Sequence, residues 1–327
     1  MLSFHALVPL DLAVFHPAGL RELSRDDRYA NFNMASMLSQ KIMAWIQLTV
    51  LLVLLIRQCA ARATLKETKR KYITANHILD RHDIVDAFGH VSIRNPEDKT
   101  TFIMAKGMAS ALISNDSDLA YYHIADASPV RPQDSGRERV EKFIHSELLK
   151  RFSGINCCVH AHTVAVIPFA TSKIPFLPVY HMVGYLGDNV PLWDITQLYD
   201  STDIQDNLVT QQKFGASLAE AFGGNGTFPQ SVFVLMKQHG FTTCAATIED
   251  AVYQAVYAKE AALAVMSQAM LQHAYYSPDT ASNGGIEALG PKQVEDTRDL
   301  PTRFRQTPWE LWTKQVEVDS LYTNNIF

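Results

Sequence analysis

The apolar stretch from Cys157 to Thr163 constrains this chain most, because it carries two histidines two residues apart. In an extended strand, side chains at positions i and i+2 point to the same side. The imidazoles of His160 and His162 can therefore reach one cation at about 2.0–2.1 Å, the usual Zn–N distance. The alternative is a core strand that happens to contain histidines, but two buried rings would then need other polar partners. The pattern favours a metal-binding strand.

Composition excludes some classes of protein. The 327 residues suffice for one large domain or two small ones, and 47% hydrophobic residues can build a sizeable core. A formal net charge of −5 gives no overall basic field, so we expect no nucleic-acid partner. Four cysteines do not make a disulfide framework in a chain of this length. The adjacent pair Cys157 and Cys158 should point to opposite faces of one strand and pack.

Residues 1–63 read as an N-terminal extension. Within it, residues 42–56 contain no charge, which is short for a membrane span of about 20 residues but suits the core of a signal peptide. Ala-Arg-Ala at 61–63 offers a cleavage pattern if translation starts at Met34. Against this, the segment lies far from Met1, and six basic residues follow it. The expected localisation is secretory or membrane-associated, with membrane contact only through 42–56; cytoplasmic is the alternative.

From residue 64 onward the pattern indicates a mixed α/β domain, 64–275, followed by a flexible linker and C-terminal tail, 276–327. Alternating residues around Asn-Pro-Glu-Asp predict a hairpin of 89–94 with 100–105. Apolar residues at helical spacing predict a long amphipathic helix over 137–152. The remaining expected elements are helices at 65–81, 208–222 and 247–272 and strands at 231–236 and 241–246. Tail residues Trp309, Trp312 and Tyr322 are aromatic enough to dock on another surface.

A third histidine completes a candidate metal site. His239 stands at the end of a predicted strand, just before a glycine, where its side chain can project into a cleft. Together with His160 and His162 it can form a three-histidine site with one position open for substrate or a carboxylate. The nearest upstream candidate carboxylate is Glu141 on the predicted helix 137–152, one turn before His145.

These motifs together resemble the class II aldolase/adducin family, which includes fuculose-phosphate aldolase and ribulose-phosphate epimerase. The similarity extends from about Tyr72 to Leu271. It rests on Glu141-x-x-x-His145, His160-x-His162 nineteen residues after the glutamate, His239-Gly240, Glu249-Asp250-Ala251, and Gly89-His90-Val91-Ser92-Ile93-Arg94, where aldolases usually have Gly-Asn-x-Ser-x-Arg.

The resemblance implies a three-layer α/β/α fold with a mostly antiparallel central sheet, assembled as a homotetramer with active sites between subunits. It implies that His160, His162 and His239 hold a divalent metal, most often zinc, with iron, manganese or cobalt in some relatives. Glu141 would be the catalytic acid/base and could bind the metal when substrate is absent. The aldolase tyrosine that donates a proton from the neighbouring subunit corresponds to His181, with Tyr180 beside it.

Departures from the family pattern concern the substrate. Where sugar-phosphate aldolases hold phosphate with an asparagine, a Thr-Gly pair and two serines, this chain has His90, Lys106-Gly107 and Arg139-Val140. Cations in place of small neutral donors would suit a carboxylate. The alternative is that Lys106 and Arg139 are solvated surface charges. Some relatives are decarboxylases, so a carboxylic acid is as plausible a substrate as a sugar phosphate.

The function that follows is a metal-dependent lyase that cleaves a C–C bond, by retro-aldol reaction or decarboxylation, through a metal-stabilised enolate. The substrate would be a small hydroxy or keto acid or a sugar derivative. One alternative is a non-catalytic, adducin-like binding module, but adducin heads lack the metal ligands that this chain retains. Another is an epimerase or isomerase that uses the same enolate chemistry. The sequence does not choose between cleavage, decarboxylation and isomerisation.

Overall fold

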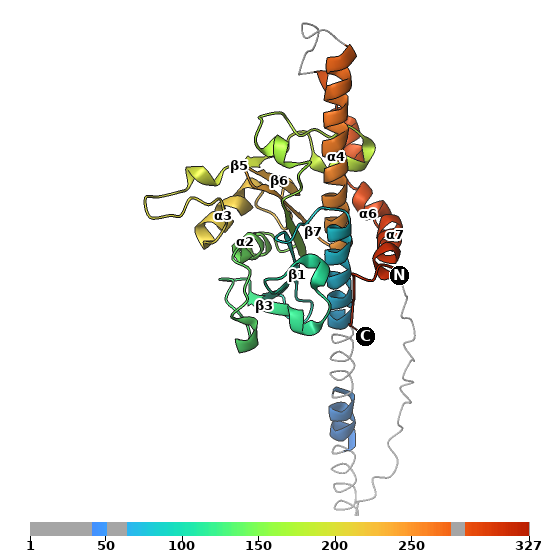
Figure 1. Ribbon diagram of the computed structural model, residues 1–327. Coiled ribbons are helices and arrows are strands. Elements are labelled where there is room, and N and C mark those ends of the chain that lie inside the picture. The colour runs from blue at the N-terminus through green and yellow to red at the C-terminus, as the bar shows by residue number, and fades with distance from the viewer. Residues whose placement is uncertain (1–40, 51–63, 276–284, 327) are drawn as a thin grey trace, which may run out of the picture. The chain divides into compact units, whose positions relative to one another are not determined.

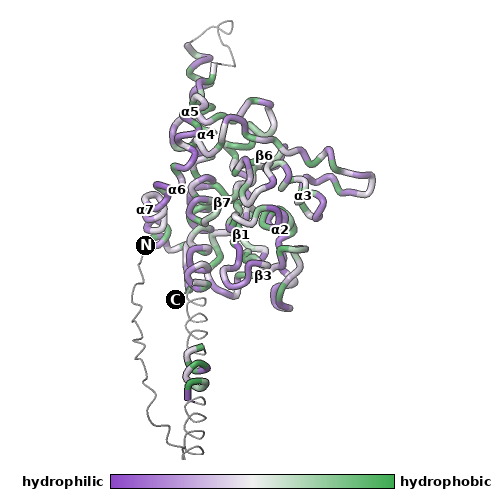
Figure 2. The backbone as a smooth tube through the Cα atoms, turned by 180° about the vertical axis from the view of Figure 1, so that it is seen from behind, coloured by the Kyte–Doolittle hydropathy of each residue, from purple (hydrophilic) through white to green (hydrophobic). Residues whose placement is uncertain are grey.

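The computed structural model describes residues 41–50, 64–275 and 285–326 of two compact units, 1–59 and 60–327. In the first unit, residues 41–50 are helical and largely hydrophobic (Figure 2), and Trp45 is 73% exposed. Met34, the rest of the apolar segment 42–56 and the predicted cleavage site at 61–63 lie outside the described residues. Among the helices that the structure describes, none has the length and hydropathy needed to cross a membrane.

The second unit is built on one sheet of seven strands. Every neighbouring pair is antiparallel except β5 and β6, which run parallel, so the prediction of a mostly antiparallel sheet is confirmed. In spatial order the strands are β3 (Leu119–His123), β2 (Thr101–Ala105), β1 (His90–Arg94), β4 (Cys157–Ala161), β7 (Gly240–Ala245), β6 (Phe233–Met236) and β5 (Leu192–Trp193).

Strand β4 lies in the middle of the sheet, and its alternation sets the two faces. Cys157 and Val159 belong to one hydrophobic core and Cys158 to the other, as the period of a strand requires. His160 therefore points to the same face as Cys158. Across the sheet, His160 is paired with His90 of β1 on one side and with Thr242 of β7 on the other. The two central ladders thus place polar side chains around His160.

Helices cover both faces, which confirms the three-layer α/β/α architecture (Figure 1). The helical residues 64–81 and the long helix α4 (Ile248–Tyr275) enclose the first core. Helices α2 (Lys142–Arg151) and α3 (Gln212–Ala221) enclose the second core, through side chains such as Leu148 and Leu218. Buried apolar area on both faces is the main favourable contribution to such a fold.

The C-terminal part corrects the expectation of a flexible tail for its described residues, 285–326. It contains helices α5 (Pro291–Thr297), α6 (Leu300–Phe304) and α7 (Gln306–Glu317). Trp309 and Trp312 of α7 are buried in the first core, and the Trp312 ring lies edge-on to His82 at 5.0 Å. Arg305 forms an ion pair with Asp250 at the start of α4. The aromatic side chains therefore dock on the same chain, and their buried area holds the tail in place.

Two further expectations differ from the structure. The predicted helix 137–152 begins only at Lys142, and Val140, an apolar residue inside the predicted range, is 61% exposed. Strands β3 and β5 were not predicted, because the first is a short run without alternation and the second has only two residues. The predicted hairpin, by contrast, forms as β1 and β2 in antiparallel register.

Candidate metal centre

His160 and His162 lie at the end of β4 and point to the same side, as predicted. Their Nε2 atoms are 3.1 Å apart. His160 is fully buried, and its other ring nitrogen, Nδ1, lies 3.2 Å from the hydroxyl of Thr242 on the neighbouring strand. Since Nδ1 is engaged by Thr242, the Nε2 lone pair of His160 is the one available at the centre of the site.

His239 reaches the same place from the tight turn between β6 and β7. The turn requires Gly240, since a Cβ there would lie 2.1 Å from the carbonyl oxygen of Ala161. This close approach brings the turn against the end of β4. The His239 ring stacks on that of His162, with centroids 5.0 Å apart, and lies 4.8 Å from the ring of His160. Three imidazoles from two adjacent strands therefore converge.

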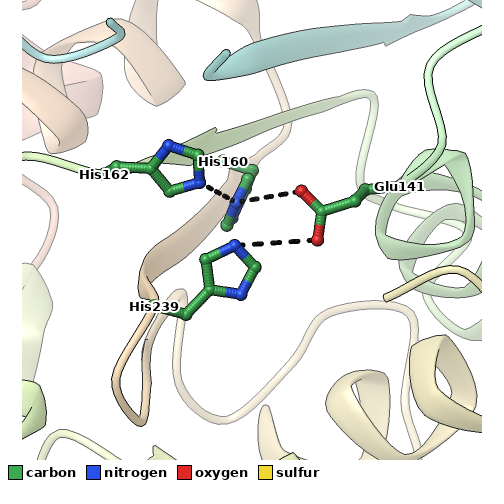
Figure 3. A group of neighbouring side chains, drawn as sticks. All are labelled: Glu141, His160, His162 and His239. Carbon is green, nitrogen blue, oxygen red and sulfur yellow. Dashed lines mark hydrogen bonds and ion pairs between the residues drawn. The ribbon is translucent and has the colours of Figure 1, made fainter. Parts of the chain in front are cut away.

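Glu141 faces the three histidines from the opposite side (Figure 3). It is the residue just before α2, so it stands at the helix start rather than within the predicted helix. Its Oε1 accepts a hydrogen bond of 3.0 Å from the backbone N–H of Val209 and lies 3.7 Å from His239 Nε2. Its Oε2 lies 3.7 Å from His160 Nε2 and accepts no hydrogen bond among the described residues.

The four residues fit a metal ion. One ligand atom from each of Glu141, His160, His162 and His239 lies within 4.8 Å of all the others. Ligands about 2.0–2.1 Å from a tetrahedral zinc ion would be about 3.3 Å apart, close to the separations of 3.1–3.7 Å found here. Burial, followed by the charges of neighbouring groups, lowers the pKa of His160 well below its usual range, and burial also lowers that of His239. Neutral imidazoles are the form that binds metal.

A fifth residue, Asp86, contacts the candidate ligand His162, and this role was not predicted from the sequence. Its Oδ1 lies 3.4 Å from His162 Nδ1, so the Nε2 of His162 remains free to face the cluster. The same oxygen accepts hydrogen bonds from the N–H groups of Phe88 and Gly89. Burial acts to raise the pKa of Asp86, but these hydrogen bonds and the charge of His162 outweigh it and lower the pKa. The only available signal was an aspartate two residues before Phe88-Gly89, which is typical of a turn.

The predicted substrate-binding residues come together, with one exception. The Arg139 side chain is only 8% exposed; its guanidinium donates to the carbonyl of Phe88 at 2.9 Å and to that of Met108. The alternative of a solvated surface charge is therefore wrong for Arg139. Arg139 thereby links Phe88, two residues before His90, to Met108, the residue after Gly107. Lys106 is half-exposed, and no side-chain partner is found for it among the described residues.

Tyr180 and His181 lie elsewhere in the described chain. They stand at the start of the 3-10 helix His181–Leu186, where Tyr180 packs against the first core and His181 is exposed. No hydrogen bond or ion pair connects either side chain to Glu141 or the three histidines within the described residues. A contribution of Tyr180 or His181 to a neighbouring subunit's site stays a prediction.

The amino-acid sequence matches one family model and is similar to two characterised enzymes. The family model of the class II aldolase and adducin N-terminal domain matches residues 70–266. The chain is 37% identical over 257 residues to the decarboxylase tropJ of Talaromyces stipitatus, covering 78% of this chain and 96% of that protein. It is 23% identical over 173 residues to methylthioribulose-1-phosphate dehydratase of Leptospira biflexa, covering 50% of this chain and 78% of that one.

Solved structures agree at the level of the fold. An L-fuculose 1-phosphate aldolase from Glaciozyma antarctica superposes with a TM-score of 0.59 at 16% identity, covering 81% of this chain and 94% of that one. An aldolase II superfamily protein from Pseudomonas syringae gives the same TM-score and identity over 79% and 95%. With the match of the family model over residues 70–266 and the 37% identical relative, these likenesses show that the chain belongs to the class II aldolase and adducin N-terminal domain family.

Proposed function

We propose that this protein is a metal-dependent carbon–carbon lyase that decarboxylates a small carboxylic acid. Family membership and the similarity to a decarboxylase support a carbon–carbon lyase. One observation carries the proposal furthest: the buried carboxylate of Glu141 faces three imidazoles and has one oxygen, Oε2, without a hydrogen bond among the described residues. A binding module would have no need to keep such a costly buried polar cluster.

The cluster would hold a divalent cation through His160, His162 and His239, with Glu141 as a fourth ligand when no substrate is present. Three nitrogens and one oxygen in this arrangement favour zinc, and iron, manganese or cobalt would also accept the same donors. When bound, the cation supplies a Lewis acid that polarises the substrate oxygen nearest to it.

Glu141 would move the proton. In a decarboxylation the bond to the carboxyl carbon breaks, carbon dioxide leaves, and the bonding electron pair stays on the neighbouring carbon, which then takes up one proton. The hydrogen bond from Val209 holds Oε1 of Glu141 in place, so Oε2 is the atom that can deliver this proton and later recover one from water. The buried position of Glu141, 5% exposed, limits competing exchange with bulk water.

Arg139 favours an acid over a sugar phosphate. Its guanidinium is buried, is bonded to two backbone carbonyls, and forms no ion pair with a carboxylate within the described residues. The charge of Arg139 nevertheless reaches His90, whose pKa is lowered by burial and further by this charge. A buried cation without a counter-ion is unfavourable, and an anionic substrate group nearby would compensate it.

A substrate panel tests the proposal. Purified protein would be incubated with hydroxy acids, keto acids and aromatic acids, and in parallel with fuculose 1-phosphate and methylthioribulose 1-phosphate. Carbon dioxide release from at least one acid is expected, and its loss in a His162→Ala variant would link it to the cluster. Turnover of fuculose 1-phosphate at ordinary enzyme efficiency, without any acid being decarboxylated, would instead make the protein an aldolase.

The active form is proposed to be a homotetramer. The support is membership in a family whose resemblance implies active sites between subunits, and Tyr180 with His181 would reach the site of a neighbouring subunit. Light scattering of active protein tests this: a tetramer whose activity falls in His181→Ala agrees with the proposal. A fully active monomer would contradict it.

A further inference from the structure

Four buried polar groups form a line that ends at the metal centre. Ser92 and Cys158 face one another across β1 and β4. The Ser92 hydroxyl lies 2.7 Å from His145 Nδ1, and His145 Nε2 lies 2.7 Å from His90 Nδ1. The last atom, His90 Nε2, is buried, has no hydrogen-bond partner within the described part of the chain, and lies 3.6 Å from Oε2 of Glu141. Cys158, Ser92 and His145 are fully buried and His90 is 3% exposed, so water does not interrupt the line.

The hydrogens along this line can point in only one of two directions. In the first, the Ser92 hydroxyl donates to His145 Nδ1, and His145 Nε2–H donates to His90 Nδ1. His90 then carries its hydrogen on Nε2, facing the site.

The second direction is less favourable at both ends. Ser92 would have to donate to the Cys158 sulfur, which is a weak acceptor. At the other end, an unprotonated Nε2 of His90 would face the Oε2 of Glu141, so that two lone pairs would lie 3.6 Å apart inside the protein. Acceptors that face each other without a hydrogen between them are costly in a buried site. The first direction avoids both penalties.

We propose that Ser92 and His145 are positioning residues that hold His90 as the Nε2–H tautomer, so that His90 offers a hydrogen-bond donor to an anionic oxygen of the substrate. The inference rests on the proposed function for the identity of that substrate, a carboxylic acid. His90 stands where aldolases of the family usually have asparagine, so the chain keeps a donor at this position but changes its shape and reach. The donor lies beside Oε2 of Glu141, the atom assigned to proton transfer.

A fixed donor is useful here because the imidazole does not have to reorganise when substrate arrives. Hydrogen bonds that are preorganised toward developing negative charge contribute more in a dry site than in water. The tautomer also has a consequence for the metal. A His90 that carries hydrogen on Nε2 cannot be a metal ligand through that atom, so the cluster keeps its three histidines and Glu141.

A neutron structure of perdeuterated protein tests the direction without any assay of activity. The expected result is deuterium on Nε2 of both His90 and His145 and none on their Nδ1 atoms. Deuterium on Nδ1 of either ring would overturn the proposal. Because this readout needs no substrate, it remains decisive even if no acid in the panel is decarboxylated, a result that would count against the proposed function alone.

Variants test the effect on catalysis. Ser92→Ala removes the donor to His145, and we expect kcat/KM for the acid to fall about 3- to 10-fold, with metal content unchanged. Ser92→Thr keeps the hydroxyl and should recover most of this loss. The matched control is Ser146→Ala, because Ser146 is equally buried and its hydroxyl has no hydrogen-bond partner among the residues that the structure describes. Equal kcat/KM values for Ser92→Ala and Ser146→Ala would refute the positioning role, and so would loss of metal in His90→Asn. If Ser92→Ala does not fold, the kinetics of Ser92→Thr and the neutron structure decide.

Discussion

Replacing Glu141 by glutamine removes the proposed proton carrier while leaving its surroundings nearly unchanged. The glutamine oxygen can take over the role of Oε1, which accepts the Val209 N–H at 3.0 Å, so the hydrogen bond that anchors the side chain remains. The amide nitrogen replaces Oε2, which accepts no hydrogen bond among the described residues and lies 3.6 Å from His90 Nε2 and 3.7 Å from His160 Nε2. We therefore expect the free energy of unfolding to change by less than about 1 kcal/mol. The three histidines should keep metal content near that of the wild type.

The effect on turnover is large by comparison. A positioned acid/base contributes about 10²–10⁴-fold, or about 3–5 kcal/mol of activation free energy, and an amide cannot exchange the proton. Single-turnover measurements on a decarboxylated acid would show kcat reduced by that factor. The matched control is Glu138→Gln, three residues earlier, where the carboxylate pairs with Lys142 outside the cluster. A Glu141→Gln enzyme with near-normal kcat would refute the role and leave Tyr180 or His181 of a neighbouring subunit as candidates.

Three further outcomes follow from the structure. Asp86→Asn keeps an oxygen for the turn but removes the charge beside His162, so metal affinity should fall about 10-fold or more in a chelator competition; unchanged affinity would show that Asp86 only shapes the turn. Trp312→Ala should cost about 3 kcal/mol in urea unfolding, whereas Leu311→Ala, at a side chain 58% exposed, should cost little; equal losses would mean that the tail does not dock through Trp312. Burial, followed by the charges of neighbouring groups, lowers the pKa of His145 well below its usual range, and it does the same to His90 and His160. Below about pH 6.5 the unfolded chain therefore binds protons that the folded chain does not, and the free energy of unfolding should fall by about 1.4 kcal/mol for each such residue per unit by which the pH is lowered. A flat profile between pH 7 and 5.5 would argue that these histidines are not held neutral.

Features with a strict local period could be predicted from the sequence. The alternation of β4 places His160 and His162 on one face whatever the rest of the chain does, and Asn-Pro-Glu-Asp between two alternating runs defines the β1–β2 hairpin. The layers and the mostly antiparallel sheet are implied by the resemblance to the family. The strand order was not predicted, because no periodicity specifies which strands become neighbours.

Features that depend on tertiary contacts could not be predicted in the same way. Helix α2 begins at Lys142 and not at the expected residue 137. Arg139 lies before the helix, where its guanidinium donates to the carbonyl groups of Phe88 and Met108, and these partners are far from it in the sequence. Burial of Trp312 depends on His82 and the first core, so the tail looked free when considered alone. Asp86 and Ser92 acquire their roles only through the tertiary contacts that bring His162, just after β4, and His145, on α2, beside them.

The metal content of purified protein shows whether Glu141 and the three histidines hold a cation. Elemental analysis of the wild type and of His162→Ala, prepared identically, should show about one divalent metal per wild-type chain and the loss of most of it in the variant, together with the loss of carbon dioxide release. His162 is the ligand to replace because its side chain is the most exposed of the three histidines, at 20%, which limits damage to the core. Stoichiometric metal in the variant, or turnover by a wild-type protein that holds no metal, would contradict the account.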